Sequence, residues 1–388
     1  MGFAALLGPA GQALLDELRD VAPEDELAAA TRLRKRYEPA LVSAALGQAQ
    51  LRQRAAAKFG ADARRMYFTP NGVEQATRAP VAAHRAARFR ALGATRAADL
   101  CCGIGGDAIA LARAGIAVLA VDRDPVTCAV ARANADALGL AGRIEVRLAD
   151  VMGVDPGREG CDALFADPAR RTGRGRTFDP EAYSPPLSWA LDAAARMPLA
   201  AVKVAPGIPH EAVPASMEAE WVSDRGDVKE AALWHGTAPG VRRATLLPSG
   251  AALTGRGLPD PRVRPVGRYL YEPDGAVIRA HLVAEVADEV GGGLIDATIA
   301  YVTSDELRPT PHATAYEIGD VLPFHLKRLK ALLRERGVGR LTVKKRGSAV
   351  EPEEVRRRVR PEGPNEATVF VTRVAGAPFM LIGAPAAT

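Results

Sequence analysis

The residues with the clearest capacity for chemistry lie in one glycine-rich segment, residues 99–108. A short apolar run leads into this segment, and a helix-like pattern follows it until Gly115. Glycines adopt positive φ and have no Cβ, so a turn rich in them lets a ligand approach the backbone closely. The strand–turn–helix pattern predicts a cofactor-binding loop, whose contacts we assign to Asp99, Cys101, Cys102, Gly103, Gly105 and Asp107.

Carboxylates also follow the next two apolar runs. Asp122 and Arg123 follow the first of them, and Asp122 suits a ribose diol because a carboxylate can accept two hydrogen bonds. Asp150 and Val151 follow the second, where Asp150 is placed to accept from an adenine amino group. In an open parallel sheet the carboxyl ends of the strands meet at one crevice. The sequence therefore predicts one ligand site bordered by these acids.

Two cofactors compete for the loop. Residues 103–108 also match the dinucleotide fingerprint G-x-G-x-x-A, so the glycines alone do not separate NAD from S-adenosylmethionine. Asp99 favours the second, because a carboxylate at the strand end suits an amino group and a sulfonium better than a pyrophosphate. Asp107, where the helix begins, would also repel a pyrophosphate. We predict S-adenosylmethionine as the cofactor; the alternatives are a dehydrogenase and acids that serve only as turn and cap residues.

A further acid, Asp167, follows the apolar run 161–166 and opens the sequence Asp-Pro-Ala-Arg. By the same crevice argument it lies opposite the methyl group of the cofactor. Methyl transfer from a sulfonium to an amine depends mainly on holding the reactants in line. We therefore predict that Asp167 orients an amine by hydrogen bonding and takes up a proton, and we place Pro168 and Arg170 beside it in the catalytic site. Lys203, on the next apolar run, we interpret as a structural residue.

The elements that must position these residues fall into three segments. Residues 1–90 are rich in Ala, Leu and Arg with helical apolar spacing, which predicts an all-helical N-terminal domain. Residues 91–257 alternate short apolar runs with amphipathic helices, as is typical of a Rossmann-like α/β sheet. A proline-rich stretch then opens a mixed α+β C-terminal region, residues 258–388.

Composition excludes several classes of protein. The chain has 388 residues, 48% hydrophobic and 25% charged, which is the balance of a folded protein and not of a disordered one. No apolar run approaches the roughly 20 residues that span a bilayer, so we expect a cytoplasmic protein without membrane association. Four cysteines without CxxC or histidine-pair spacing predict reduced, buried thiols and no metal site.

Basic residues are concentrated in two segments. Between residues 27 and 90, thirteen Lys or Arg stand against Glu38, Asp62 and Glu74, a net charge of +10. Between residues 327 and 346, nine basic residues stand against Glu335. Two separated basic patches fit a nucleic-acid backbone held on both sides of a catalytic crevice. Solvated helix faces in an arginine-rich chain are the alternative interpretation.

The motifs resemble those of class I S-adenosylmethionine-dependent methyltransferases. Segments 99–106, 121–125 and 131–135 are similar to the trimethylguanosine-synthase type, whose members methylate the exocyclic amine of guanine in RNA. The chain resembles more closely the bacterial methyltransferases that carry a C-terminal THUMP-like domain, through segments 71–78, 167–171, 178–180, 183–186, 205–210, 269–273 and 344–347. The resemblance implies methylation of structured RNA, tRNA or rRNA, by a Rossmann-like sheet between a helical N-terminal domain and an α+β THUMP-like region.

The sequence departs from the pattern of amino methyltransferases at one place. These enzymes usually carry (D/N/S)-P-P-aromatic, whereas Ala169 and Arg170 stand here for the second proline and the aromatic residue. Arg170 can stack on a base or bind a phosphate. We predict a methyltransferase that acts on an exocyclic amine or ring nitrogen in RNA. A non-catalytic protein that binds the cofactor and RNA, and a small-molecule methyltransferase, are the alternatives.

Overall fold

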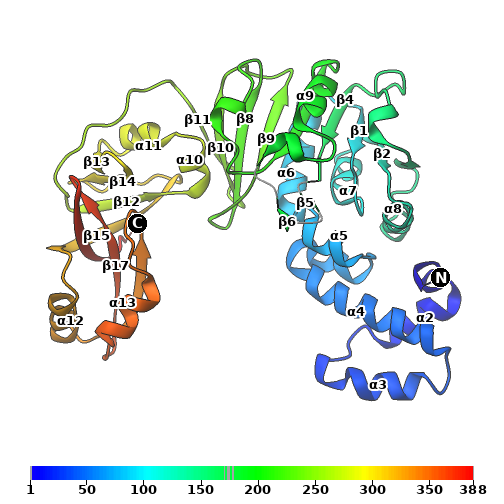
Figure 1. Cartoon of the computed structure of the whole chain (residues 1–388), viewed down its shortest axis with the longest axis horizontal. Coiled ribbons are helices and arrows are strands. Elements are labelled where there is room, and N and C mark those ends of the chain that lie inside the picture. The colour runs from blue at the N-terminus through cyan, green and yellow to red at the C-terminus, as the bar shows by residue number, and fades with distance from the viewer. Residues whose placement is uncertain (1, 170, 173–174, 177–178, 388) are drawn as a thin grey trace. The chain divides into compact units, whose positions relative to one another are not determined.

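The chain forms two compact units that alternate along the sequence. The computed structural model describes residues 2–169, 171–172, 175–176 and 179–387. The first unit holds residues 1–218 and 231–240, and the second holds residues 219–230 and 241–388 (Figure 1). The helical segment that the sequence predicts at the N-terminus is therefore packed in the same unit as the α/β sheet. The division at residues 90 and 257 stays a prediction.

Helices precede the sheet in the first unit, as the apolar spacing predicts. Four of them have proline in the first turn, where the missing N–H has no intrahelical partner to lose. None of the described helices is long and apolar enough to cross a membrane. The helices are α1 Gly2–Leu6, α2 Pro9–Glu17, α3 Glu26–Leu33, α4 Pro39–Phe59, α5 Pro70–Gln75 and α6 Ala79–Ala91, with 3₁₀ turns η1 Pro23–Asp25 and η2 Gly60–Arg64.

The sheet of the first unit has the strand order β9–β7–β4–β1–β2–β3. Its strands are parallel except β9, which runs antiparallel to β7. The elements are β1 Arg96–Leu100, α7 Gly106–Arg113, β2 Ala117–Asp122, α8 Pro125–Ala137, β3 Ile144–Leu148, η3 Val151–Gly153, β4 Ala163–Ala166, β5 Arg171–Thr172, β6 Gly175–Arg176, η4 Pro180–Ala182, α9 Leu187–Ala195, β7 Leu199–Val204, η5 His210–Ala212 and β9 Asp227–His235.

Alternate residues of these strands pack against helices on one face of the sheet. Ala97, Val118 and Phe165 share a buried cluster with apolar residues of α6, α7 and α8. The crossover helices α7 and α8 thus stay close to the glycine-rich turn after β1, which lies at the carboxyl edge of the strands. This is the Rossmann-like arrangement that the sequence predicts.

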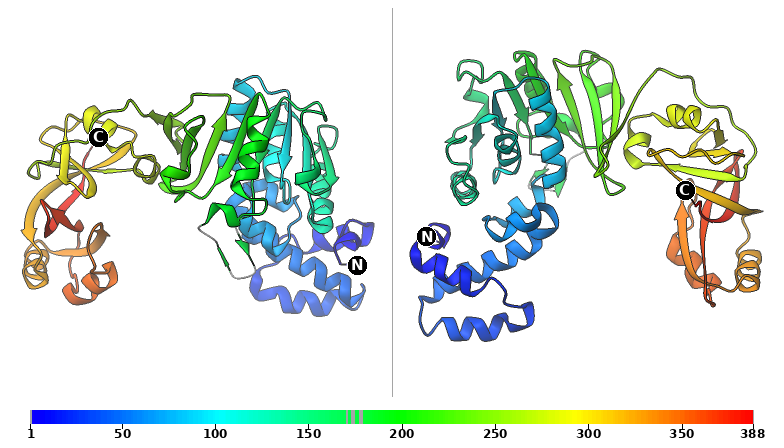
Figure 2. Two further views of the ribbon diagram at one scale, coloured as in Figure 1. Left: turned by 45° about the horizontal axis from the view of Figure 1, so that its top comes forward. Right: turned by 180° about the vertical axis from the view of Figure 1, so that it is seen from behind.

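The second unit contains two groups of strands. The strands β8, β10 and β11 pair in the order β11–β10–β8, and a separate sheet has the order β13–β14–β12–β15–β18–β17–β16. Leu329 and Leu333 of α12 and Val355 and Val359 of α13 share one buried cluster with residues of this sheet. Figure 2 shows the ribbon of this unit from two further sides. The elements are β8 Glu218–Asp224, β10 Arg242–Leu247, β11 Ala251–Thr254, β12 Tyr269–Pro273, α10 Gly275–Arg279, α11 Val283–Glu289, β13 Gly293–Asp296, β14 Ile299–Ser304, β15 Ala313–Pro323, α12 Leu326–Glu335, β16 Val338–Lys345, α13 Pro352–Val359, β17 Asn365–Val374 and β18 Ala377–Pro385.

Asn134 on α8 joins the helical segment to the glycine-rich turn. Its side chain is fully buried, and Nδ2 donates to the carbonyl oxygens of Tyr67 at 3.0 Å and Ile104 at 2.9 Å. Its Oδ1 accepts from the Tyr67 amide at 2.6 Å. One amide side chain therefore satisfies three backbone groups that would otherwise be buried without partners.

We expect Asn134→Ala to lower the free energy of unfolding by about 2–4 kcal/mol, because three buried backbone groups lose their partner. Urea unfolding followed by circular dichroism measures the change. Asp136→Ala, at an exposed position of the same helix, is the matched control and should stay within about 0.5 kcal/mol of the wild type. Equal unfolding midpoints for the two variants would contradict the bridging role of Asn134.

Candidate functional site

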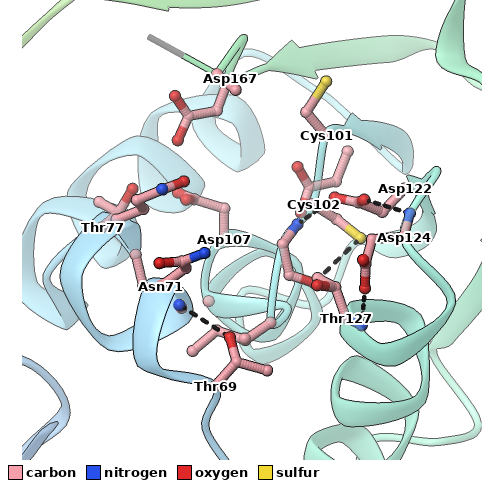
Figure 3. Close-up of a pocket in the computed structure, with 18 of the residues that line it drawn as sticks. Thr69, Asn71, Thr77, Cys101, Cys102, Asp107, Asp122, Asp124, Thr127 and Asp167 are labelled. Atoms are coloured by element: carbon pink, nitrogen blue, oxygen red, sulfur yellow. Dashed lines mark hydrogen bonds between the residues drawn. The ribbon is translucent and has the colours of Figure 1, made fainter. Parts of the chain in front are cut away.

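A cavity of about 440 Å³ opens in the first unit where β1, β2 and β4 end (Figure 3). The parallel register of β1 with β2 and with β4 brings these ends to one edge of the sheet. Residues of the segment 69–77, from the helical region, form a further wall. Four of the acids predicted for the site line this cavity, namely Asp99, Asp107, Asp122 and Asp167.

The turn after β1 has a backbone conformation that favours glycine. Gly103 and Gly105 have φ of 55° and 86°, and Cys101 takes a φ of 63°. A left-handed conformation at a non-glycine residue is strained, and such strain is concentrated at functional sites. A Cβ added at Gly103 would meet no atom within 4 Å, so this part of the cavity wall is bare backbone beside open space. The turn therefore leaves room for a ligand against the main chain.

Asp99 is buried at the cavity, near Arg85 and the Ala108 amide, but without an ion pair among the described residues. It is 1% exposed, and neither carboxyl oxygen has a hydrogen bond of normal geometry within the described residues. Burial, followed by the charges of Asp107 and Asp167, holds the pKa of Asp99 well above its usual value. A buried carboxyl without donors is costly unless a ligand supplies them. The geometry thus marks Asp99 as a place for a cationic donor group.

Two of the other acids are paired with buried cations. Asp107 accepts from Arg85, which is 3% exposed and lies with its guanidinium 4.1 Å from the centroid of the Phe165 ring. Asp167 accepts at Oδ2 from Lys203 Nζ at 2.7 Å. These pairings distinguish Asp99 from its neighbours, because each of the two neighbours has a cation of its own in contact.

Asp122 orders the turn through backbone amides. Its two oxygens accept from the amides of Gly103 and Asp124, each at 3.0 Å. Asp124 in turn caps α8 by accepting from the Thr127 amide at 2.6 Å. A carboxylate oxygen can accept more than one hydrogen bond, so Asp122 keeps the capacity to bind a ribose hydroxyl.

The remaining predicted residues are only partly found at the cavity. Cys101, Cys102, Arg123 and Pro168 line the cavity, whereas Gly105 stands behind the wall as the N-cap of α7. Asp150 and Val151 do not line it; the Asp150 side chain instead accepts from the Met152 amide at 2.9 Å, and its contact with adenine stays a prediction. Arg170 lies outside the described residues.

The prediction that all four thiols are buried is wrong for Cys101. The thiols of Cys102, Cys128 and Cys161 are buried and free, but Cys101 is only half-buried and borders the cavity. Burial, followed by the charge of Asp122, raises the pKa of Cys101. The residue therefore remains a thiol and is a poor nucleophile.

Sequence reasoning missed two parts of the site. Lys203 reaches the carboxylate predicted to be catalytic, although we interpreted it as structural. The sequence carries no signal for this contact, because it depends on the register of β4 with β7, which pairs Ala166 with Val202 and so sets Asp167 beside Lys203. The wall formed by the segment 69–77 could not be placed from the sequence, since nothing local shows that this segment packs over the turn.

Comparisons with known proteins match most of the chain. A family model described as a methyltransferase domain matches residues 97–169, one described as THUMP domain-like matches 313–385, and a domain of unknown function matches 1–55. An uncharacterized S-adenosylmethionine-dependent methyltransferase of Mycobacterium tuberculosis, found in two strains, is 36% identical over 335 residues, which cover 84% of this chain and 90% of that protein. The chain belongs to the S-adenosylmethionine-dependent methyltransferases. A solved methyltransferase structure from Porphyromonas gingivalis W83 has the same fold, with a TM-score of 0.79 at 21% identity over 97% of this chain and 98% of that one.

S-adenosylmethionine is therefore the cofactor of this methyltransferase, and the cavity fits it. When bound, it supplies a methyl group carried on a sulfonium cation. The unpartnered oxygens of Asp99 suit its amino group, the bare backbone at Gly103 leaves it room, and Asp122 suits its ribose. The described residues thus offer partners for the amino group and the ribose of the cofactor, through Asp99 and Asp122.

We expect Asp99→Asn to weaken S-adenosylmethionine binding about 10- to 100-fold, because a charge-assisted contact is lost. In the wild type, binding should tighten as pH rises, since the cofactor's cation displaces a proton from a carboxyl whose pKa is raised. The amide cannot titrate, so this pH dependence should disappear in the variant. Isothermal titration calorimetry from pH 5.5 to 8.5 measures both effects.

Stability provides the second readout for Asp99. A carboxyl whose pKa is raised by folding binds more protons in the folded state than in the unfolded state. Its contribution to the free energy of unfolding is therefore full at low pH and is lost as pH rises toward the folded pKa. Asp99→Asn should therefore melt at a higher temperature than the wild type at pH 8 and show a smaller difference at pH 5. Asp136→Asn, exposed on α8, should change neither binding nor melting. An unchanged affinity in Asp99→Asn would remove Asp99 from the cofactor site.

Proposed function

We propose that this methyltransferase transfers a methyl group to a nitrogen of a nucleotide in structured RNA, either an exocyclic amine or a ring nitrogen in tRNA or rRNA. The observation that carries the proposal is the position of Asp167 at the cofactor cavity, with a side chain that is 23% exposed. Lys203 occupies Oδ2, and the remaining acceptor capacity of the carboxylate suits an N–H of the acceptor. As the N–C bond forms and the C–S bond breaks, the nitrogen gives up a proton, and Asp167 is placed to take it.

The loop that carries Asp167 is fixed at the backbone. Ala169 and Ser184 exchange both hydrogen bonds, with each N···O distance 3.0 Å. The amide of Asp167 also donates to the Leu100 carbonyl at 3.1 Å, which ties the loop to the end of β1. These backbone hydrogen bonds favour in-line transfer, because positioning of the reactants dominates this chemistry.

RNA as the acceptor is supported by the second unit, whose residues 313–385 are THUMP domain-like. The two helices of this THUMP domain-like region, α12 and α13, carry exposed cations that have no ion-pair partner in the described part of the chain. These residues are Lys327, Arg328, Lys330 and Arg334 on α12 and Arg357 and Arg360 at α13. Since α12 and α13 pack on the same face of one sheet, the cations suit a phosphate backbone.

The basic segment 27–90 supports RNA binding less than its net charge suggests. Most of its cations bind groups within the first unit; Arg52, for example, donates to the Met66 carbonyl at 2.9 Å, and Lys58 donates to that of Ala76 at 2.9 Å. The same holds for Arg36, Arg54, Arg64, Arg65, Arg78, Arg85 and Arg88. The interpretation as an RNA surface therefore rests mainly on the second unit.

A small-molecule acceptor is the second candidate, and one observation favours it. The described residues that line the cavity include no aromatic side chain that could stack on a base. A nucleobase acceptor would then depend on stacking partners in the RNA itself or on the loop that follows Ala169. A substrate screen separates the two candidates, since only RNA gives a strong dependence on salt.

We expect Asp167→Ala to reduce the rate of methyl transfer about 100-fold or more, because the acceptor loses its orienting carboxylate. Its affinity for S-adenosylmethionine should be equal to that of the wild type or slightly tighter, since Asp167 is one of the charges that raise the pKa of Asp99. Single-turnover kinetics and calorimetry measure the two quantities. Asp192→Ala, exposed on α9, is the control. Equal losses of rate and affinity would exclude Asp167 from the catalytic role.

The substrate itself is tested with radiolabelled S-adenosylmethionine. Bulk tRNA and rRNA should accept the label, and transcripts that lack one nucleotide type at a time should identify the target. The logarithm of RNA affinity should fall with the logarithm of salt concentration, by about 0.7–0.9 for each phosphate contact. Lys330→Ala and Arg334→Ala should each lower that slope, whereas Arg340→Ala should not, because Arg340 is paired with Glu366 at 2.5 Å. Labelling of metabolites alone, with no RNA labelled, would favour the small-molecule candidate.

A further inference from the structure

Lys203 is a buried cation in the wall of the cofactor cavity. It lies on β7 and is 5% exposed. Its ammonium donates to Asp167 Oδ2 at 2.7 Å and to Thr77 Oγ1 at 3.0 Å. Thr77 belongs to the linker between α5 and α6, and is itself buried. The ammonium thus connects the catalytic loop after β4 with the helical segment of the same unit.

A lysine is costly at this position of the sheet. All six residues of β7 are buried, and the other five are apolar, as expected for an inner strand of a parallel sheet. Desolvation of a buried cation is repaid only when it is paired with good geometry. An apolar side chain such as methionine would fill the same strand position without this penalty. The choice of lysine therefore points to its partner, Asp167.

Asp167 shares its surroundings with several other acids. Around the pair stand Asp99 and Cys101 at the end of β1, Asp107 at the start of α7 and Arg85 on α6, which is bound to Asp107. The other charged groups that line the cavity are Glu74 on α5 and Asp122, Arg123 and Asp124 after β2. Carboxylates this close to one another do not all ionise unless cations are in contact with them.

The protonation state of Asp167 decides whether the acceptor nitrogen can react. An ionised carboxylate is only an acceptor, so it binds the N–H and leaves the nitrogen lone pair free for the methyl group. A protonated carboxyl also has an O–H donor, which would bind that lone pair and block the attack. A cation fixed beside the carboxylate disfavours the protonated form, and so keeps the O–H group from binding the lone pair.

We propose that Lys203 is a positioning residue for methyl transfer: anchored by Thr77, it keeps Asp167 ionised and turned so that its free oxygen meets the acceptor. The proposal rests on the proposed function, because it takes Asp167 as the partner of the acceptor nitrogen. Lys203 acts through Asp167, and the bond-making atoms are the acceptor nitrogen and the methyl carbon.

The first test is the pH dependence of methyl transfer in Lys203→Met and Lys203→Arg. Lys203→Met should lose about 10- to 100-fold in rate at pH 7, with the acidic limb of the pH–rate profile moved to higher pH, so that part of the rate returns near pH 9. Lys203→Arg keeps a cation and should restore most of the rate at pH 7. The affinity for S-adenosylmethionine should change less than about threefold in both. Arg196→Met, exposed at the end of α9, is the control for loss of a charge.

The second test needs no RNA. The melting temperature of Lys203→Met should fall increasingly below that of the wild type as pH rises from 5 to 8, because the half-buried Asp167 must then ionise beside other acids without its cation. Asp167→Asn added to Lys203→Met should abolish this pH-dependent deficit, because the amide does not titrate. The double variant therefore reports on the pair itself.

Two results would overturn the proposal. One is a Lys203→Met rate that is lowered equally at every pH and is not restored by Lys203→Arg; the other is a melting deficit that persists in the double variant. Either would make Lys203 a structural residue of β7. A wild-type protein that methylates no RNA would instead overturn the proposed function, and the melting series would still decide whether Lys203 keeps Asp167 ionised.

Discussion

A buried carboxyl group with no hydrogen bond of normal geometry among the described residues is the constraint on which the cofactor site depends. Asp99 is the fourth of the five residues of β1, it is 1% exposed, and its neighbours Ala98 and Leu100 are apolar and buried. Burial and the two nearest acids hold its pKa high, and a positively charged ligand relieves the penalty. Within the described residues, Asp107 is paired with Arg85 and Asp167 with Lys203, whereas the more deeply buried Asp99 has no ion-pair partner.

The cations of the neighbouring acids come from distant parts of the chain. Arg85, on α6, reaches Asp107, and Lys203, on β7, reaches Asp167. These contacts join the helical segment to the sheet within one compact unit. Arg85 comes from α6, and the hydroxyl of Thr77, in the linker between α5 and α6, accepts from Lys203. The helical segment therefore supplies partners to Asp107 and Lys203, which line the cofactor cavity.

In the second unit, the net charge of a segment overstates the number of cations that are free to bind a ligand. Of the basic residues between 327 and 346, Arg336, Arg340, Lys344 and Lys345 are held in ion pairs, while the cations of α12 remain exposed. Leu329 and Leu333 bury the opposite side of this helix against the sheet, and this burial turns its cations to solvent. The amphipathic helix α12 thus presents a row of exposed cations to solvent, which the net charge of the segment alone does not establish.

The sequence by itself determined the Rossmann-like sheet, the glycine-rich turn and the acids at the strand ends, because strand length, positive-φ glycines and the residue after each apolar run are local properties. It placed Asp99, Asp122 and Asp167 at one edge, since parallel strands share their carboxyl ends. Only the tertiary structure decided which acids are paired, that Asp150 accepts from the Met152 amide, and that Lys203 lies beside Asp167. The ion pairs depend on strand register and on helix packing between residues far apart in the chain, and a contact between distant residues leaves no periodicity in the sequence around either of them.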